Sequence, residues 1–132
     1  MTKDVFLAGA ARTAIGTFGG AFEQTPAPVL GSIVLKAALE RAGVPHEEVD
    51  EVVFGNVVGA GLGQNVARQV TIGGGLASSV GATTVNKVCG SGLESVMLAA
   101  QAIQCRCGRD CRGRNGEHVT RAVLIGQSSW QR

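Results

Sequence analysis

The sequence predicts an α/β fold, in which a sheet is flanked by helices. Short apolar runs, typical of buried strands, lie at residues 5–8 and 52–54, and residues 83–88 are rich in β-branched side chains, which also favour a strand. Each run is followed by a segment whose apolar residues recur at helical spacing, and glycines or prolines mark the junctions. Three strand–helix repeats are typical of a sheet with right-handed crossovers. With 132 residues and 45% hydrophobic content, the chain is long enough to bury one core.

The first strand and the first helix are predicted within residues 5–43. Residues 5–8 form an apolar run that ends at Gly9, which predicts a buried strand, and residues 12–25 follow as a loop. Pro26 and Pro28 then begin a helix, where the missing proline N–H costs nothing, and Gly43 ends it. The expected apolar face of this helix contains Val29, Ile33, Val34, Ala37, Ala38 and Leu39.

Two further repeats complete the pattern. Residues 52–54 predict the second strand, and a helix over about residues 65–72 is stopped by three glycines at 73–75. Residues 83–88 are rich in β-branched side chains and predict the third strand. This strand leads into a helix whose expected apolar face contains Leu93, Val96, Met97, Ala100 and Ile103.

Cys89 lies at the predicted turn between the third strand and its helix. Open α/β sheets place ligands beyond the carboxyl ends of their strands, where this turn would lie. A helix N-terminus carries free N–H groups and a partial positive charge, which stabilise a thiolate and an oxyanion. Gly90 and Gly92 leave room for a substrate carbonyl to approach the sulfur. The pattern therefore predicts a nucleophilic cysteine, with a buried structural cysteine as the alternative.

The residues around Cys89 resemble a known family. Residues 86–96 read Asn-Lys-Val-Cys-Gly-Ser-Gly-Leu-Glu-Ser-Val and closely resemble the acyl-enzyme cysteine motif of the thiolases. Segments similar to the same family occur in order at residues 11–16, 18–22, 39–43, 55–58 and 61–69. The resemblance runs without evident gaps from about residue 4 to residue 104.

The resemblance implies a thiolase-like fold, of which this chain holds an incomplete N-terminal half with a mixed sheet flanked by helices. The chain corresponds to roughly the first quarter to third of a usual thiolase. The family's downstream motifs are a histidine in a Gly-His-Pro setting, a second cysteine and an Asn-Glu-Ala-Phe segment, and none of them occurs in these 132 residues. We therefore expect the chain to be inactive alone.

The resemblance also implies a mechanism, in which Cys89 attacks an acyl-CoA and holds the acyl group as a thioester. In synthesis the carbanion of a second acetyl-CoA attacks that thioester and gives a 3-ketoacyl-CoA; thiolysis is the reverse. The backbone N–H of Cys89 would contribute to one oxyanion pocket. Coenzyme A arrives with the substrates, so we expect no separate cofactor and no metal. The parent enzyme is expected to be a homodimer or homotetramer.

The N-terminus has no basic region followed by a long apolar stretch, and no apolar run approaches membrane-spanning length. These features predict a soluble cytoplasmic protein with no membrane or nucleic-acid partner.

The last part of the chain differs from the rest, which predicts a partial thiolase N-terminal domain at residues 1–104 and an aberrant tail at 105–132. Residues 1–104 hold six Lys/Arg and eight acids, whereas the tail holds six Arg and two acids. The family would continue into a buried strand similar to Ile-Val-Val-Ala-Gly-Gly-Met-Glu. Residues 106–115 can be encoded so that reading one base later gives Gly-Ala-Ala-Glu-Ile-Val-Val-Ala-Gly-Met. We therefore interpret residues 105–116 as out of frame, with the likeness resuming at residue 117.

Three alternatives remain at this level. The cysteines and the histidine of the tail could bind zinc, in which case the ligands would be Cys105, Cys107, Cys111 and His118. The arginines of the tail could instead bind nucleic acid. A ketoacyl synthase or a hydroxymethylglutaryl-CoA synthase would also place a cysteine at a strand–helix turn. A non-catalytic fragment or pseudogene product is the third alternative.

Overall fold

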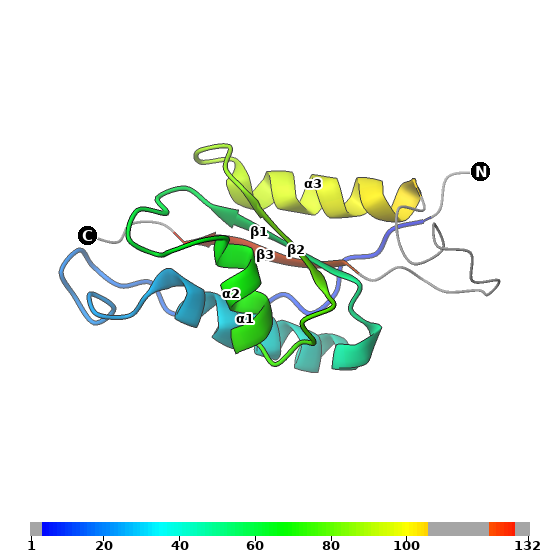
Figure 1. The fold of residues 1–132 in the computed structure, drawn as a ribbon, viewed down its shortest axis with the longest axis horizontal. Coiled ribbons are helices and arrows are strands. Elements are labelled where there is room, and N and C mark those ends of the chain that lie inside the picture. Colours follow the sequence, from blue (N-terminus) through cyan, green and yellow to red (C-terminus); the bar gives the residue numbers. More distant parts are fainter. Residues whose placement is uncertain (1–3, 106–121, 129–132) are drawn as a thin grey trace.

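The structure, a computed structural model, describes residues 4–105 and 122–128. A three-stranded parallel sheet has the order β2-β1-β3, with β1 at Glu51–Asn56, β2 at Gly81–Val85 and β3 at Ala122–Ser128. Helices α1 (Ala27–Ala42) and α2 (Val66–Gly73) lie on one side of the sheet, and α3 (Ser91–Gln104) lies on the other (Figure 1). A short 3-10 helix, η1 (His46–Glu48), precedes β1. The predicted α/β class, with a small sheet flanked by helices, is confirmed, but the pairings among the described strands are parallel where a mixed sheet was expected.

The core lies between β1 and the α1–α2 pair. Five of the six residues of β1 are buried, which is expected for a central parallel strand covered on both faces. On the α1–α2 side, the cluster consists of Leu35, Leu39, Val49, Val52, Phe54, Val66, Ala67, Val70, Leu76 and Val80. The aliphatic composition of this cluster follows from the low aromatic content of the chain.

The helix boundaries agree closely with the sequence prediction. Pro28 lies in the first turn of α1, and Gly43 ends the helix in the left-handed conformation, at φ 63°. Asn65 caps α2 because its side chain accepts a hydrogen bond from the N–H of Arg68 at 3.2 Å.

The strand predicted at residues 5–8 does not form, and this prediction was wrong. Phe6 and Leu7 are 86% and 72% exposed, and the backbone there is not part of the sheet. An apolar run becomes a strand only where its backbone finds a hydrogen-bonded partner; both edges of β1 are taken by β2 and β3, and this segment pairs with neither of those outer strands. The segment instead passes α1, where the side chain of Arg41 donates to the carbonyl of Ala10 at 2.7 Å.

The predicted apolar faces of two helices were also partly wrong. On α1, Leu39 is buried as expected, but Val29 and Ile33 are about half exposed. On α3, Leu93 and Met97 are exposed, and the buried residues are the small ones, Ser91, Ser95 and Ala99.

The three small residues of α3 recur every four positions, so they form one stripe along the helix. Helix α3 packs against β1 and β3, and a stripe without bulky side chains lets it lie close to the sheet.

Strand β3 comes from the segment that the sequence assigns to the tail. It runs parallel to β1, from the pairing of Glu51 with Ala122 to that of Asn56 with Ser128, with an irregularity between Phe54 and Asn56. The sheet is therefore built from residues on both sides of the predicted boundary at 104–105. Among the helices of the described residues, none is long and apolar enough to cross a membrane.

Candidate active site

The candidate site is the turn of residues 86–90, which joins the end of β2 to the start of α3. Strand β2 ends at Val85, three residues earlier than the predicted end of the third strand. Cys89 is exposed and carries a free thiol, and Gly90 is the N-cap residue of α3. The cysteine thus lies directly before a helix N-terminus, at the carboxyl end of a parallel strand, as the sequence predicted.

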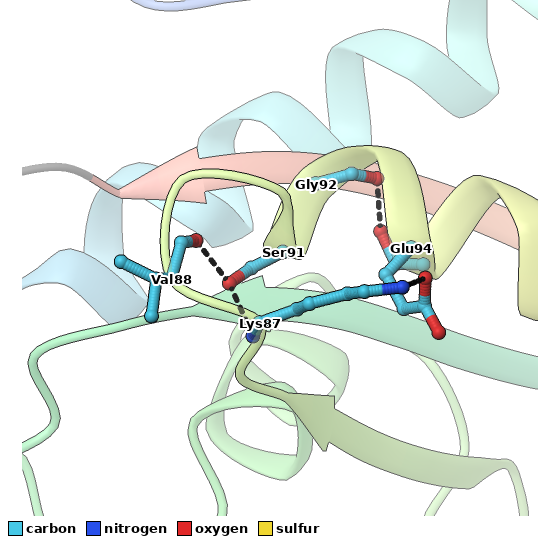
Figure 2. A network of polar contacts seen from close by, with 6 residues as sticks. Lys87, Val88, Ser91, Gly92 and Glu94 are labelled. Atoms are coloured by element: carbon cyan, nitrogen blue, oxygen red, sulfur yellow. Dashed lines mark hydrogen bonds and ion pairs between the residues drawn. The ribbon is translucent and has the colours of Figure 1, made fainter.

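Ser91 holds the turn together from inside. Its side chain is fully buried, and its hydroxyl uses both of its hydrogen-bonding functions. The hydroxyl accepts a hydrogen bond from the N–H of Lys87 at 2.8 Å and donates one to the carbonyl of Val88 at 2.6 Å (Figure 2). The N–H of Ser91 also donates to the Val88 carbonyl, at 3.1 Å.

Val88 has a strained backbone immediately before the cysteine. Its φ is +50°, a left-handed conformation that a β-branched residue rarely adopts and that costs about 1–3 kcal/mol. Its side chain is 64% exposed, so packing of that side chain does not hold the conformation. Hydrogen bonds do: Asn86 Oδ1 accepts from the N–H of Val88 at 3.0 Å, and Ser91 binds the Val88 carbonyl. The Val88 backbone is therefore clamped at both its N–H and its carbonyl.

The turn is also tied to its surroundings. Asn86 donates from Nδ2 to the carbonyl of Val57 at 3.2 Å, which links the turn to the segment after β1. Lys87 Nζ and Glu94 Oε2 form an ion pair at 2.6 Å across the first turn of α3 (Figure 2). The Lys87 side chain is mostly exposed, so this pair contributes at most about 1 kcal/mol.

Gly55 on β1 sets how closely α3 approaches the sheet. A Cβ atom at residue 55 would lie 2.7 Å from the carbonyl carbon of Ser91 and 2.8 Å from the N atom of Gly92. Both are backbone atoms of the first turn of α3, which cannot move aside as the end of a flexible side chain can. Glycine at residue 55 therefore allows the helix start, and Cys89 just before it, to lie against the sheet.

Gly90 is not required by crowding or by an unusual backbone. Its φ is −86°, which other residues adopt, and a Cβ there would meet its nearest neighbour, the Lys87 carbonyl oxygen, at 3.4 Å. Among the described residues, no hydrogen-bond acceptor pairs with the N–H of Cys89. The turn therefore offers an exposed thiol and a backbone N–H without an acceptor among the described residues, the two groups that attack on a thioester carbonyl requires.

Sequence reasoning placed Cys89 at the strand–helix turn but missed the residues that hold this turn. The roles of Asn86, Ser91 and Gly55 were not predicted; an asparagine two residues before a left-handed position is a local signal for the first of them. Of the four alternative zinc ligands, Cys105 is exposed, while Cys107, Cys111 and His118 lie outside the described residues. Within residues 4–105 and 122–128 no group of three potential metal ligands gathers.

Comparison with known proteins decides the family. Residues 5–110 match the family described as the thiolase N-terminal domain. The chain belongs to the thiolase family. Its relatives include the acetyl-CoA acetyltransferase of Cupriavidus necator, 61% identical over 100 residues, and the mitochondrial acetyl-CoA acetyltransferase of Xenopus tropicalis, 57% identical over 103 residues. These matches cover 76% and 78% of this chain, respectively.

A solved thiolase structure has the same fold. The Acat5 thiolase of Ascaris suum, in complex with coenzyme A, matches with a TM-score of 0.70 and 40% sequence identity over 71% of this chain. That match covers 25% of the Ascaris protein, and the matches to the Cupriavidus and Xenopus thiolases cover 25% and 24% of those proteins. The chain thus spans about a quarter of the length of the thiolases it matches. Because the relatives include bacterial and mitochondrial proteins, a cytoplasmic location stays an expectation from the sequence.

Proposed function

We propose that this thiolase segment supplies the nucleophile of an acetyl-CoA C-acyltransferase and that Cys89 is that nucleophile. The observation that carries the proposal is the position of an exposed thiol directly before the N-terminus of α3, within a chain of the thiolase family. The Cys89 sulfur would attack the thioester carbonyl of an acyl-CoA. The new bond joins the acyl carbon to Sγ, the bond to the coenzyme A sulfur breaks, and coenzyme A leaves as its thiol after taking up a proton.

The geometry of the turn supports the first half of this reaction. The N–H of Cys89 has no acceptor among the described residues and would be available to donate to the oxyanion that forms when sulfur attacks. Acyl-CoA and coenzyme A are the proposed partners, and the coenzyme A complex of the Ascaris thiolase supports this substrate class. A homodimeric or homotetrameric parent enzyme remains a prediction.

The second half of the reaction requires residues that this chain does not supply. The histidine and second cysteine motifs that the family resemblance implies do not occur in the sequence. We therefore propose that the 132 residues alone do not turn over substrate. They would contribute the nucleophile to a site that further residues complete. A non-catalytic fragment is the alternative. It predicts that this segment does not support catalysis even when the rest of a thiolase is supplied.

A chimera separates these two proposals. The 100 matched residues of this chain would replace their counterparts in the Cupriavidus necator acetyl-CoA acetyltransferase. We expect the chimera to cleave acetoacetyl-CoA in the presence of coenzyme A, within about tenfold of the parent rate, since the Cys89 turn lies inside the exchanged segment. The parent enzyme is the control. A folded chimera without thiolysis activity would favour the non-catalytic fragment.

We also propose that residues 105–116 are translated out of frame. The matches to the Cupriavidus and Xenopus thiolases span only 100 and 103 residues, and the sequence from residue 105 departs from the pattern expected after α3. Resequencing the gene is expected to reveal one insertion or deletion near codon 105 and a second near codon 116. An uninterrupted reading frame identical to the present one would refute the frameshift.

A further inference from the structure

We propose that Ser91 is a positioning residue, which acts on Cys89 by holding Val88 in its strained conformation. The inference goes beyond the proposed role of Cys89 and rests on it, because the orientation of the cysteine matters only if its sulfur and N–H act on a substrate. Ser91 itself is fully buried below the turn, so it acts through the backbone and does not contact the acyl group.

The argument begins with the left-handed backbone of Val88. A valine at φ +50° returns to an extended or helical conformation unless its surroundings prevent it. Because residue 88 directly precedes the cysteine, any such change rotates the peptide that carries the Cys89 N–H and redirects the Cys89 side chain. The conformation of Val88 therefore sets where the sulfur and the oxyanion donor lie relative to the start of α3.

Ser91 is the buried part of the clamp on Val88. Its hydroxyl bridges the N–H of Lys87 and the carbonyl of Val88, at 2.8 and 2.6 Å, and thus ties the peptide before Lys87 to the peptide after Val88. Asn86 completes the clamp at the Val88 N–H, but Asn86 is exposed, so water can replace its hydrogen bond. No water can reach a fully buried hydroxyl, so Ser91→Ala would leave the Lys87 N–H without its acceptor and the Val88 carbonyl with only the longer hydrogen bond from the backbone N–H of residue 91, at 3.1 Å.

The same helix contains a matched control. Ser95 is also fully buried, and its hydroxyl donates to the carbonyl of Gly92 at 2.7 Å, within α3 itself. Ser95→Ala removes a buried serine hydroxyl of the same helix without touching the turn. A role of Ser91 in helix stability alone would give the two alanine variants the same effect on Cys89.

The test uses the complete 132-residue chain and measures the reactivity of the Cys89 thiol. Iodoacetamide alkylation is followed at each cysteine by peptide mass mapping, and the rate at Cys89 is divided by the rate at Cys105, which is exposed and distant in sequence. We expect Ser91→Ala to lower this ratio about threefold, because the sulfur moves away from the positive end of α3. Ser95→Ala is expected to leave the ratio unchanged.

A double variant distinguishes positioning from packing. Glycine adopts positive φ without strain, so Ser91→Ala combined with Val88→Gly is expected to recover at least half of the lost alkylation ratio. A Ser91→Ala ratio equal to that of the unchanged chain, or a double variant without recovery, would overturn the proposal. If Ser91→Ala alone fails to fold, a folded double variant with the original ratio supports the proposal, and an unfolded one contradicts it.

A second arm of the same experiment tests the proposed function separately. The Cupriavidus chimera replaces the 132-residue chain and acetyl-CoA replaces iodoacetamide, and transfer of the acetyl group to Cys89 is expected to fall about tenfold in Ser91→Ala. Absence of acetyl transfer in the unchanged chimera would count against the proposed function, while the alkylation ratios would still decide the role of Ser91.

Discussion

Replacing Gly55 with alanine is expected to destabilise the fold by about 3 kcal/mol and to move the start of α3 away from the sheet. The added Cβ would lie 2.7 Å from the Ser91 carbonyl carbon and 2.8 Å from the Ser91 carbonyl oxygen. This clash can be relieved only if the backbone of β1 or of α3 shifts, because the atoms that the added Cβ meets belong to the backbone and not to a flexible side chain. The shift would carry Cys89 with it, so the variant combines a loss of stability with a loss of site geometry.

Gly90→Ala is the control for this prediction. It adds the same methyl group one residue after Cys89, where the nearest atom lies 3.4 Å away and φ is −86°. We expect its free energy of unfolding to stay within about 1 kcal/mol of that of the unchanged chain. Urea unfolding followed by circular dichroism measures both variants. Equal midpoints for Gly55→Ala and the unchanged chain would contradict the close approach of α3 to β1.

Cys89→Ser in the Cupriavidus chimera is expected to lower the rate of acetoacetyl-CoA cleavage by at least about 10³-fold. The serine hydroxyl is nearly the size of the thiol, but it is a far weaker nucleophile at neutral pH unless a base activates it. Since residue 89 is exposed and makes no packing contact in the core, the change should leave the fold intact. Circular dichroism and the thermal midpoint verify this.

The matched control for that variant is Cys105→Ser. Cys105 is also exposed, but it follows the far end of α3, whose 14 residues separate it from the turn. We expect its replacement to leave the absolute rate of iodoacetamide alkylation at Cys89 unchanged in the 132-residue chain, where residue 105 no longer serves as the reference thiol. A chimera that keeps its activity after Cys89→Ser would show that the acyl group is carried elsewhere.

Much of the fold could be predicted because its signals are local. Pro28 and Gly43 mark the ends of α1 through the conformations that these two residues prefer, and the structure confirms both. The strand at residues 5–8 was wrong because strand formation depends on a hydrogen-bonded partner in the sheet, and this segment pairs with none of the three strands. Local sequence carries no information on which edges remain.

The helix faces were harder to predict for a related reason. Hydrophobic spacing predicted that Leu93 and Met97 are buried. The residues of α3 that are buried are instead Ser91, Ser95 and Ala99. Small polar residues give no signal in a hydrophobic pattern, although they permit close packing. The clamp on Val88 was missed for the same reason, because it depends on a buried serine hydroxyl.

The most direct test of the central claim is to trap the acyl group on the enzyme. The chimera is mixed with acetyl-CoA in the absence of a second substrate, quenched in acid, digested and mapped by mass spectrometry. We predict one acetyl group on the peptide that contains Cys89, with release of one equivalent of coenzyme A. A chimera that turns over acetoacetyl-CoA while its Cys89 peptide carries no acetyl group would contradict the account.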